Sequence, residues 1–178
     1  MRALAKGDRT AAEVLARRHL DRLHAFAHRM LGNGADAEDV AQEAFARLWE
    51  HAAAWDPARG RVSTWLHRVA SNLCIDRARR RHADGADMDT MTGAVDDGPA
   101  YRAEAAELGA HVRAALESLP ERQRLALTLC HYQGLRQDDA AAVLGVSVAA
   151  LESLLARARR AMRERLRPVA RDLLGDER

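Results

Sequence analysis

Residues 137–155, which read QDDAAAVLGVSVAALESLL, carry the pattern of two short helices joined by a tight turn. Ala141 is a small residue at the point where the two helices would cross, and Gly145 tolerates the left-handed backbone that such a turn needs. Ser147 is placed to cap the second helix. The segment predicts a helix-turn-helix whose second helix lies in the major groove of DNA, with an ordinary helical hairpin as the alternative.

The second helix of this motif is expected to run from Val148 to about Arg167, where Pro168 would stop it. Its arginines form an electrostatic footprint for phosphates. They are Arg157, Arg159, Arg160, Arg163, Arg165 and Arg167. Lys6 is the only lysine of the chain, and arginine suits bidentate contacts to phosphate and guanine, although a GC-rich genome also favours arginine and alanine codons.

Two further helices are predicted in the C-terminal half before the motif, and three in the N-terminal half. The former cover residues 104–119 and residues 120–132, with Pro120 in the first turn, and the first helix of the motif covers residues 137–144. The latter cover residues 11–31, a helix that begins with Asp36 as its N-cap, and residues 63–82, with a loop from Trp55 to Gly60 before the last. Leu23 and Phe26 are expected in the core.

Residues 83–99, which read ADGADMDTMTGAVDDGP, have no hydrophobic period and no basic residue. This composition is typical of a flexible acidic linker. We therefore expect an all-α fold of two small helical domains. The expected boundaries are 1–82 for the first domain, 83–103 for the linker and 104–178 for the domain with the helix-turn-helix.

The third helix of the N-terminal half carries a polar stripe beside its apolar stripe. Arg61, Arg68, Asn72 and Arg79 follow one another at steps of seven, four and seven residues, so they project within a narrow arc. Arginines can hold a single strand by its phosphates, and asparagine can read a base edge. The apolar stripe, which is expected to face the core, comprises Trp65, Val69 and Leu73, and further charge at the helix end comes from Arg77, Arg80 and Arg81.

The bulk composition excludes several classes of protein. Of the 178 residues, 30% are charged and only 4% are aromatic, which disfavours a large β-sandwich or barrel. Cys74 and Cys130 stand far apart, so a disulfide framework is not expected. No apolar run approaches a membrane span, and the N-terminus lacks the core of a signal peptide. We expect a soluble, cytoplasmic protein without membrane insertion.

Four segments in sequence order resemble an extracytoplasmic-function (ECF) sigma factor of the sigma-70 family. DAEDVAQEAF at 36–45 looks like region 2.2 of that family, and WLHRVASN at 65–72 with Asp76 and Arg77 looks like regions 2.3–2.4. LPERQR at 119–124 looks like the start of region 4, and LGVS at 144–147 looks like its helix-turn-helix. The resemblance covers about 10–82 and 104–167.

The resemblance implies a promoter-specificity factor, not an enzyme, that needs no cofactor. Such a factor binds core RNA polymerase through the β′ coiled coil and the β flap, reads promoter DNA and is commonly held by an anti-sigma factor. The implied polymerase contacts are Asp39, Gln42 and Glu43. The implied −10 contacts are Arg61, Arg68, Asn72, Arg79 and Arg80, and the implied −35 contacts are Glu152, Ser153, Arg157 and Arg160. The loop 55–61 would hold an unstacked base; Trp55 could stack there, but packing in the core is preferred.

The front of the predicted recognition helix departs from the family. The family usually carries Gly-Thr-Val-Lys-Ser-Arg, whereas residues 149–154 read AALESL, so Glu152 and Leu154 replace a lysine and an arginine. Glu152 could accept a hydrogen bond from cytosine, pair with Arg159 or Arg160, or repel the DNA backbone. This departure motivates one alternative, a sigma-like decoy that sequesters an anti-sigma factor without binding DNA. A simple repressor of the helix-turn-helix type is a further alternative, which leaves the N-terminal half unexplained.

Two smaller groups are interpreted as structural. His24 and His28 stand four residues apart, a spacing that can hold a metal, but no further ligand is near them in sequence, and a solvated or core-edge pair is preferred. Cys130 lies in an apolar helix beside His131, where buried packing is favoured over redox or metal sensing. No metal site is predicted.

Overall fold

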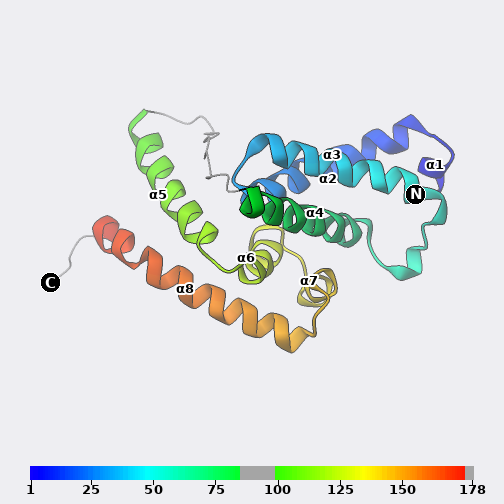
Figure 1. Ribbon diagram of the computed structural model, residues 1–178. Coiled ribbons are helices and arrows are strands. Elements are labelled where there is room, and N and C mark those ends of the chain that lie inside the picture. Colours follow the sequence, from blue (N-terminus) through cyan, green and yellow to red (C-terminus); the bar gives the residue numbers. More distant parts are fainter. Residues whose placement is uncertain (85–98, 175–178) are drawn as a thin grey trace.

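The computed structural model describes residues 1–84 and 99–174, and within them the chain is helical without a strand. The elements are α1 (Arg2–Ala5), α2 (Arg9–Leu31), α3 (Gly34–His51), η1 (Ala52–Ala54), η2 (Pro57–Arg59), α4 (Val62–Asp84), α5 (Pro99–Glu117), α6 (Glu121–Leu127), η3 (Thr128–Tyr132), α7 (Gln137–Leu144) and α8 (Val148–Leu174) (Figure 1). The all-α expectation is confirmed. Most of the predicted acidic linker, from 85 to 98, lies outside the described residues.

The N-terminal unit is formed by α2, α3 and α4, which pack pairwise against one another. Their shared core is closed by side chains that are at most 1% exposed, and Leu23 and Phe26 belong to it as predicted. The other large members are Val40, Leu48 and Leu66. Since each helix contributes one apolar stripe to this core, the opposite stripe of α3 and of α4 stays in solvent.

The predicted start of α3 was wrong by three residues. Asn33, not Asp36, is the N-cap, and its Oδ1 accepts a hydrogen bond from the backbone N–H of Asp36 at 3.0 Å. Both residue types cap helices well, so the local sequence did not separate them. The Asp36 carboxylate is instead used for an ion pair with Arg81 at the end of α4.

The helix-turn-helix is confirmed in α7 and α8, which are bent by 94° across the turn. Gly145 has a left-handed backbone with φ of 64°, and Ala141 is only 3% exposed. The Ser147 hydroxyl accepts a hydrogen bond from the N–H of Ala150 at 3.2 Å, as expected of a cap. Leu151 and Leu155 close the small core behind the turn.

Three helix boundaries in the C-terminal half differ from the predictions. Helix α5 begins at Pro99 and not at the predicted Glu104, so the last residues of the predicted linker 83–103 are helical. Pro168 does not stop α8, which continues to Leu174. A proline inside a helix removes one backbone hydrogen bond and can bend the helix axis, but the helix can continue beyond it. The helix predicted up to Tyr132 is α-helical only to Leu127. It then widens into the π-helical turn η3, in which the N–H of Gln133 bonds to the carbonyl of Thr128 at 3.0 Å.

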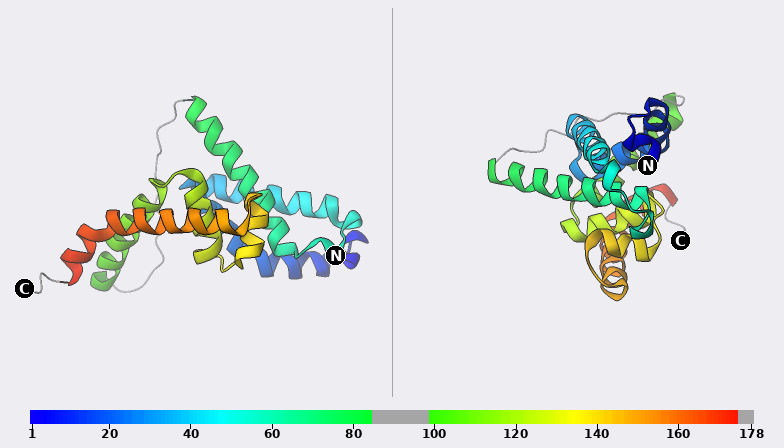
Figure 2. Two further views of the ribbon diagram at one scale, coloured as in Figure 1. Left: turned by 90° about the horizontal axis from the view of Figure 1, so that it is seen from below. Right: turned by 90° about the vertical axis from the view of Figure 1, so that its right-hand side faces the viewer.

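The helices α5 to α8 lie on one side of the N-terminal unit, and the two halves are in contact (Figure 2). Helix α7 packs against α4, and η3 packs against α2. The Thr64 hydroxyl donates to Asp139 Oδ1 at 3.1 Å, and the Arg29 guanidinium lies 4.6 Å from the centre of the Tyr132 ring. Within the described residues, no single helix is long and apolar enough to span a membrane.

Candidate nucleic-acid interface

The polar stripe of α4 lies in solvent over its whole length. Arg61 directly precedes α4, and its carbonyl accepts the N–H of Trp65 at 3.1 Å. Arg61 therefore extends the stripe by one residue into the loop before the helix. The predicted −10 residues Arg61, Arg68, Asn72, Arg79 and Arg80 are all exposed. The same helix buries Leu66 and Leu73 on its other side. The stripe therefore presents guanidinium and amide groups along one edge of the N-terminal unit.

A pocket of about 280 Å³ opens at the start of this stripe. It is lined by His51, Ala54, Trp55, Asp56, Gly60, Arg61, Thr64, Trp65, Arg68 and Ala142. The short helices η1 and η2 connect α3 to α4 beside this pocket. The start of η2 is fixed by a hydrogen bond at 2.9 Å, in which Asp56 Oδ1 accepts the N–H of Ala58. Both arginines that begin the α4 stripe thus stand at an aromatic cavity.

The aromatic wall of the pocket is built from three rings. His51 stacks on Trp65 with ring centres 5.5 Å apart and an interplanar angle of 4°. Trp55 stands edge-on to both rings at 6.2 Å. Trp65 and Trp55 were predicted to face the core; both are half-buried and pack against it, and both also line the pocket. Aromatic faces in an open cavity favour a stacked base as ligand.

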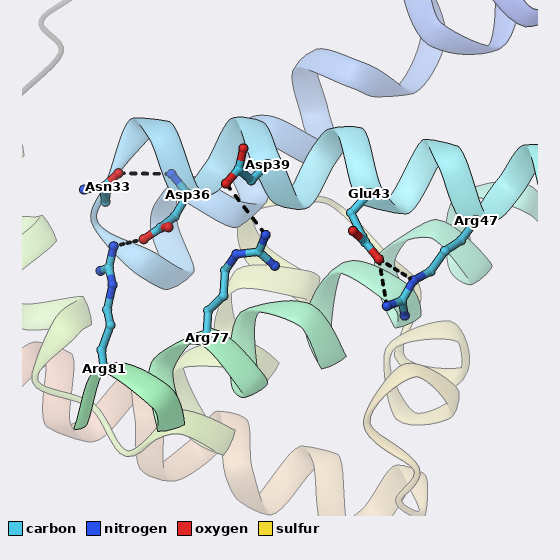
Figure 3. A network of polar contacts seen from close by, with 7 residues as sticks. All are labelled: Asn33, Asp36, Asp39, Glu43, Arg47, Arg77 and Arg81. Atoms are coloured by element: carbon cyan, nitrogen blue, oxygen red, sulfur yellow. Dashed lines mark hydrogen bonds and ion pairs between the residues drawn. The ribbon is translucent and has the colours of Figure 1, made fainter. Parts of the chain in front are cut away.

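The arginines at the end of α4 are divided between two faces. Arg77 lies 3.9 Å from the Asp39 carboxylate, and Arg81 forms an ion pair with Asp36 and donates to the carbonyl of Leu31 at 3.2 Å (Figure 3). These two residues, four apart, turn towards α3 and the end of α2. Arg79 and Arg80 remain on the exposed side, so only part of the predicted charge adds to the stripe.

The predicted polymerase contacts lie on the solvent side of α3. Asp39, Gln42 and Glu43 are exposed, and Glu43 pairs with Arg47 one turn later at 2.9 Å (Figure 3). Exposed ion pairs of this kind contribute only about 0–1 kcal/mol, so a partner can replace them at little cost. The face is therefore available to a partner that offers basic or amide groups.

The predicted −35 contacts are all exposed on α8. Glu152 and Ser153 lie in its front turns, and Arg157 and Arg160 follow. The Ser153 hydroxyl donates to the carbonyl of Ala149 at 3.0 Å, and Arg157 donates through Nε to the carbonyl of Ser153 at 3.2 Å. The front of this helix thus presents small side chains and one carboxylate, and its guanidinium groups begin farther along.

His67 lies on α4, beside the exposed polar stripe of that helix, and only 5% of its surface is exposed. Its Nδ1 lies 2.8 Å from the carbonyl of Ser63, and its ring stands edge-on to Phe26. Burial lowers the pKa of His67, against the opposing effect of hydrogen bonds to the Ser63 carbonyl and the Gln133 side chain. The neutral ring is therefore part of the packing between α4 and the loop after η3.

The two cysteines and the pair His24 and His28 are buried or half-buried among the helices. Burial raises the pKa of the Cys74 thiol to about 12, and it also raises the pKa of Cys130, which is half-buried against the core. The rings of His24 and His28 lie 6.3 Å apart and are tilted. Among the described residues, no group of three or more His, Cys, Asp or Glu side chains is placed to hold a metal ion.

Four pocket residues were missed in the sequence, namely His51, Ala54, Thr64 and Ala142. His51 ends α3, Ala54 ends η1, Thr64 sits in the first turn of α4, and Ala142 comes from α7 in the other half of the chain. A sequence pattern reports which residues share one helix face, but it does not report which helices meet. No local signal identifies these four residues as neighbours.

Comparison with known families matches both halves of the chain. Residues 15–83 match the model of sigma-70 region 2, and residues 110–162 match the model of sigma-70 region 4. The matched segments coincide with the unit formed by α2 to α4 and with the helix-turn-helix half.

Individual proteins are similar over most of the chain. The ECF RNA polymerase sigma factor SigE of Mycolicibacterium smegmatis is 37% identical over 91% of this chain, which spans 65% of that relative's length. The ECF RNA polymerase sigma factor SigW of Bacillus subtilis is 32% identical, with 91% of this chain and 92% of the relative covered. The solved structure of CnrH in complex with the cytosolic domain of CnrY has a TM-score of 0.71 and 28% identity over 93% of both chains.

Proposed function

The chain belongs to the extracytoplasmic-function class of the sigma-70 family, and we propose from this membership and from the α4 surface that it directs core RNA polymerase to promoters. In this proposal the N-terminal unit holds the −10 element as a single strand, and the C-terminal half docks on the −35 element as a duplex. The polymerase performs the chemistry, and the chain itself is not an enzyme.

The observation that carries the proposal is the arginine and asparagine stripe that leads into an aromatic pocket. Arg61 and Arg68 stand at the pocket, and Asn72 and Arg79 continue the line along α4. Guanidinium groups neutralise the phosphates of a strand, whereas a base that leaves the stack needs an aromatic face to replace its neighbours. Only an unpaired strand offers both groups at once, which favours melted DNA over a closed duplex.

The −35 element is assigned to α8 through its exposed front and its arginines. Arg157 and Arg160 would contact phosphates, and Ser153 would lie at a base edge or at the backbone. Glu152 would accept a hydrogen bond from the N4 amino group of cytosine in the major groove. A carboxylate repels phosphates, so we infer that α8 contacts the DNA backbone through Arg157 and Arg160. Glu152 must then stay at a base edge, because a shift of the helix towards a phosphate would be unfavourable.

The polymerase contact is assigned to the solvent face of α3. Asp39, Gln42 and Glu43 offer acceptors to the β′ coiled coil, at the expense of weak ion pairs with Arg77 and Arg47. The helix-turn-helix half would in addition contact the β flap. The sigma factor RpoE of Bartonella quintana, whose structure has a TM-score of 0.72 to this chain, was solved in complex with the anti-sigma factor NepR. By this analogy, an anti-sigma factor is the expected regulator of the chain.

The test is promoter-dependent transcription by core polymerase with Arg68→Ala combined with Asn72→Ala. Two lost nucleic-acid contacts of about 1–3 kcal/mol each predict a loss of roughly 30-fold or more in transcripts. Binding of the variant to core polymerase should stay at the parental level. The matched control is Arg9→Ala with Arg17→Ala, which removes exposed arginine charge from α2 and should transcribe normally.

Full transcription by the α4 double variant would contradict the proposal, and so would the absence of transcripts from the parental chain across a promoter library. The second outcome, together with intact binding to an anti-sigma factor, is what a decoy protein would give.

A further inference from the structure

Two of the three rings in the aromatic wall of the pocket are joined by the short helix η1. His51 directly precedes Ala52–Ala54, and Trp55 directly follows this segment. Ala54 itself lines the pocket. The spacing of the His51 and Trp55 rings, whose centres are 6.2 Å apart, therefore depends on the conformation and position of η1.

The hydrogen bonding of η1 holds this helix only weakly. It is a 3-10 helix of three residues, a form with poorer hydrogen-bond geometry than the α-helix. The bond that closes it runs from the N–H of Trp55 to the carbonyl of Ala52 at 3.4 Å, which is longer than most bonds of this kind. Ala52 is nevertheless buried. We infer that the packing around η1 contributes more to its position than its own hydrogen bond does.

Helix α1 supplies part of this packing. It packs against η1 and against α2, and Figure 1 shows it beside the end of α3. Leu4 is the buried residue of α1, and it belongs to the same core cluster as Ala52. None of the residues that line the pocket belongs to α1, so α1 supports η1 from outside the pocket.

The corner between α1 and α2 keeps Leu4 in this position. The N–H of Gly7 bonds to the carbonyl of Leu4 at 2.9 Å, and the N–H of Asp8 bonds to the carbonyl of Ala3 at 3.1 Å. With the left-handed φ of 77° at Gly7, these two bonds form a Schellman motif. The Asp8 carboxylate then caps α2 by accepting the N–H of Thr10 at 2.9 Å. Helix α1 is thus fixed to the start of α2.

We propose that α1 positions the aromatic wall of the pocket, and that Leu4 is the positioning residue that holds η1, and through it Trp55, in place for stacking. The match to sigma-70 region 2 begins at residue 15, so α1 lies outside the matched segment. The inference rests on the proposed function, because the place of Trp55 matters for DNA only if a base stacks there. Leu4 acts without contacting DNA. Its loss leaves a cavity beside η1, and the wall is then no longer preorganised.

The first test compares Leu4→Ala with Leu20→Ala, which removes the same atoms from a leucine that is 39% exposed on α2. Each variant is bound to core RNA polymerase and titrated with a fluorescein-labelled single strand of about 12 nucleotides, taken from the −10 element of a promoter that the parent transcribes. Leu4→Ala should bind this strand roughly fivefold more weakly, the lower end of the loss of one stacked base. Leu4→Met, which refills the space, should restore most of the affinity, and Leu20→Ala should bind as the parent does.

The second test observes the tryptophans of the free chain without DNA. With 5-fluorotryptophan incorporated, each resonance is assigned by replacing one tryptophan at a time with phenylalanine. Leu4→Ala should shift or broaden the fluorine resonance of Trp55, and it should leave that of Trp49, which is exposed on α3, unchanged. A merely destabilised unit would instead change both resonances and would also lose its binding to core polymerase.

Gly7→Ala weakens the attachment of α1 without opening a cavity in the core. A Cβ at Gly7 meets no atom within 4 Å, but the left-handed backbone there strains any other residue. Single-strand affinity should fall about twofold, and the Trp55 resonance should move in the same direction as in Leu4→Ala. If Leu4→Ala does not fold, Gly7→Ala provides the same comparison.

An unchanged Trp55 resonance in Leu4→Ala and Gly7→Ala would overturn the role of α1, and so would equal losses of affinity in Leu4→Ala and Leu20→Ala. A parental complex that binds the strand no better than core polymerase alone would refute the proposed function instead. The fluorine spectrum would in that case still decide whether Leu4 positions Trp55.

Discussion

The two surfaces that we propose for nucleic-acid binding, on α4 and on α8, differ in the groups that they expose. On α4, guanidinium and amide groups lead into a cavity walled by Trp55 and Trp65. On α8, the front turns expose small side chains and the carboxylate of Glu152, and the arginines come later. One surface has places for bases and phosphates together, and the other has charge without a cavity. Under the proposed function, this difference assigns unpaired DNA to α4 and duplex DNA to α8.

Removing the aromatic wall should have the largest effect on this contrast. Trp55→Ala takes away one ring of the pocket, and base stacking on an aromatic side chain contributes about 1–3 kcal/mol, so affinity for a −10 single strand should fall by roughly 5- to 150-fold. Affinity for −35 duplex should not change. The measurement is fluorescence anisotropy with both DNAs, on the protein bound to core polymerase.

Trp49→Ala is the control for this variant, because Trp49 is 47% exposed on α3 and does not line the pocket. Equal losses for both tryptophans, or a loss of duplex binding with Trp55→Ala, would remove the distinction between the two surfaces.

Reversing the charge at the front of α8 should have a smaller effect with the opposite sign. Glu152→Lys replaces a carboxylate that repels phosphates with a cation that attracts them. Affinity for a duplex of unrelated sequence, which lacks the proposed cytosine contact, should rise roughly fivefold, and the slope of log K against log salt should steepen by about 0.9. Single-strand binding should be unaffected. A salt titration of duplex binding measures both quantities.

Glu13→Lys makes the same change of charge on the exposed side of α2. If it raises duplex affinity as much as Glu152→Lys, the effect is one of net charge, and the front of α8 does not lie against the DNA.

The smallest expected effect is a dependence of the free energy of unfolding on pH, which arises from histidines packed among the helices. Burial holds the native pKa of His67 below 6.5, so the unfolded chain binds more protons once the pH falls below that value. The free energy of unfolding should be constant above about pH 6.5 and decrease as the pH falls from there towards the native pKa. His19 and His28, whose pKa values burial also lowers, contribute in the same direction.

Urea unfolding at about pH 7.5 and about pH 5.5 measures this dependence. His67→Gln should reduce it in part, whereas His131→Gln, at an exposed position, should leave it at the parental size. A dependence that is unchanged by His67→Gln would show that the ring is not protonated on unfolding.

The fold was largely predictable because its information is local. The helix-turn-helix needed a small residue at 141, a left-handed glycine at 145 and a cap at 147, and each of these is a property of a few neighbouring residues. The errors occur where local rules permit two answers. Asn33 and Asp36 are equally good caps, and a proline such as Pro168 can bend a helix as well as end it.

The candidate site was predictable only along single helices. The step from Arg68 to Asn72 to Arg79 follows from helical geometry, and all three residues are exposed. The turning of Arg77 and Arg81 towards α3 depends on carboxylates that lie more than thirty residues away in sequence. The bond from Thr64 to Asp139 joins residues 75 positions apart, and no periodicity encodes such a meeting.

The attachment of Arg81 has a mechanical consequence. It grips the Asp36 carboxylate and the Leu31 carbonyl at the last turns of α4, just before the chain leaves for the C-terminal half. A force on the chain that follows α4 therefore acts first on these polar bonds, and it reaches Leu73 and Leu66 in the core only after they break. Arg81 thus anchors the last turns of α4 to the end of α2 and the start of α3.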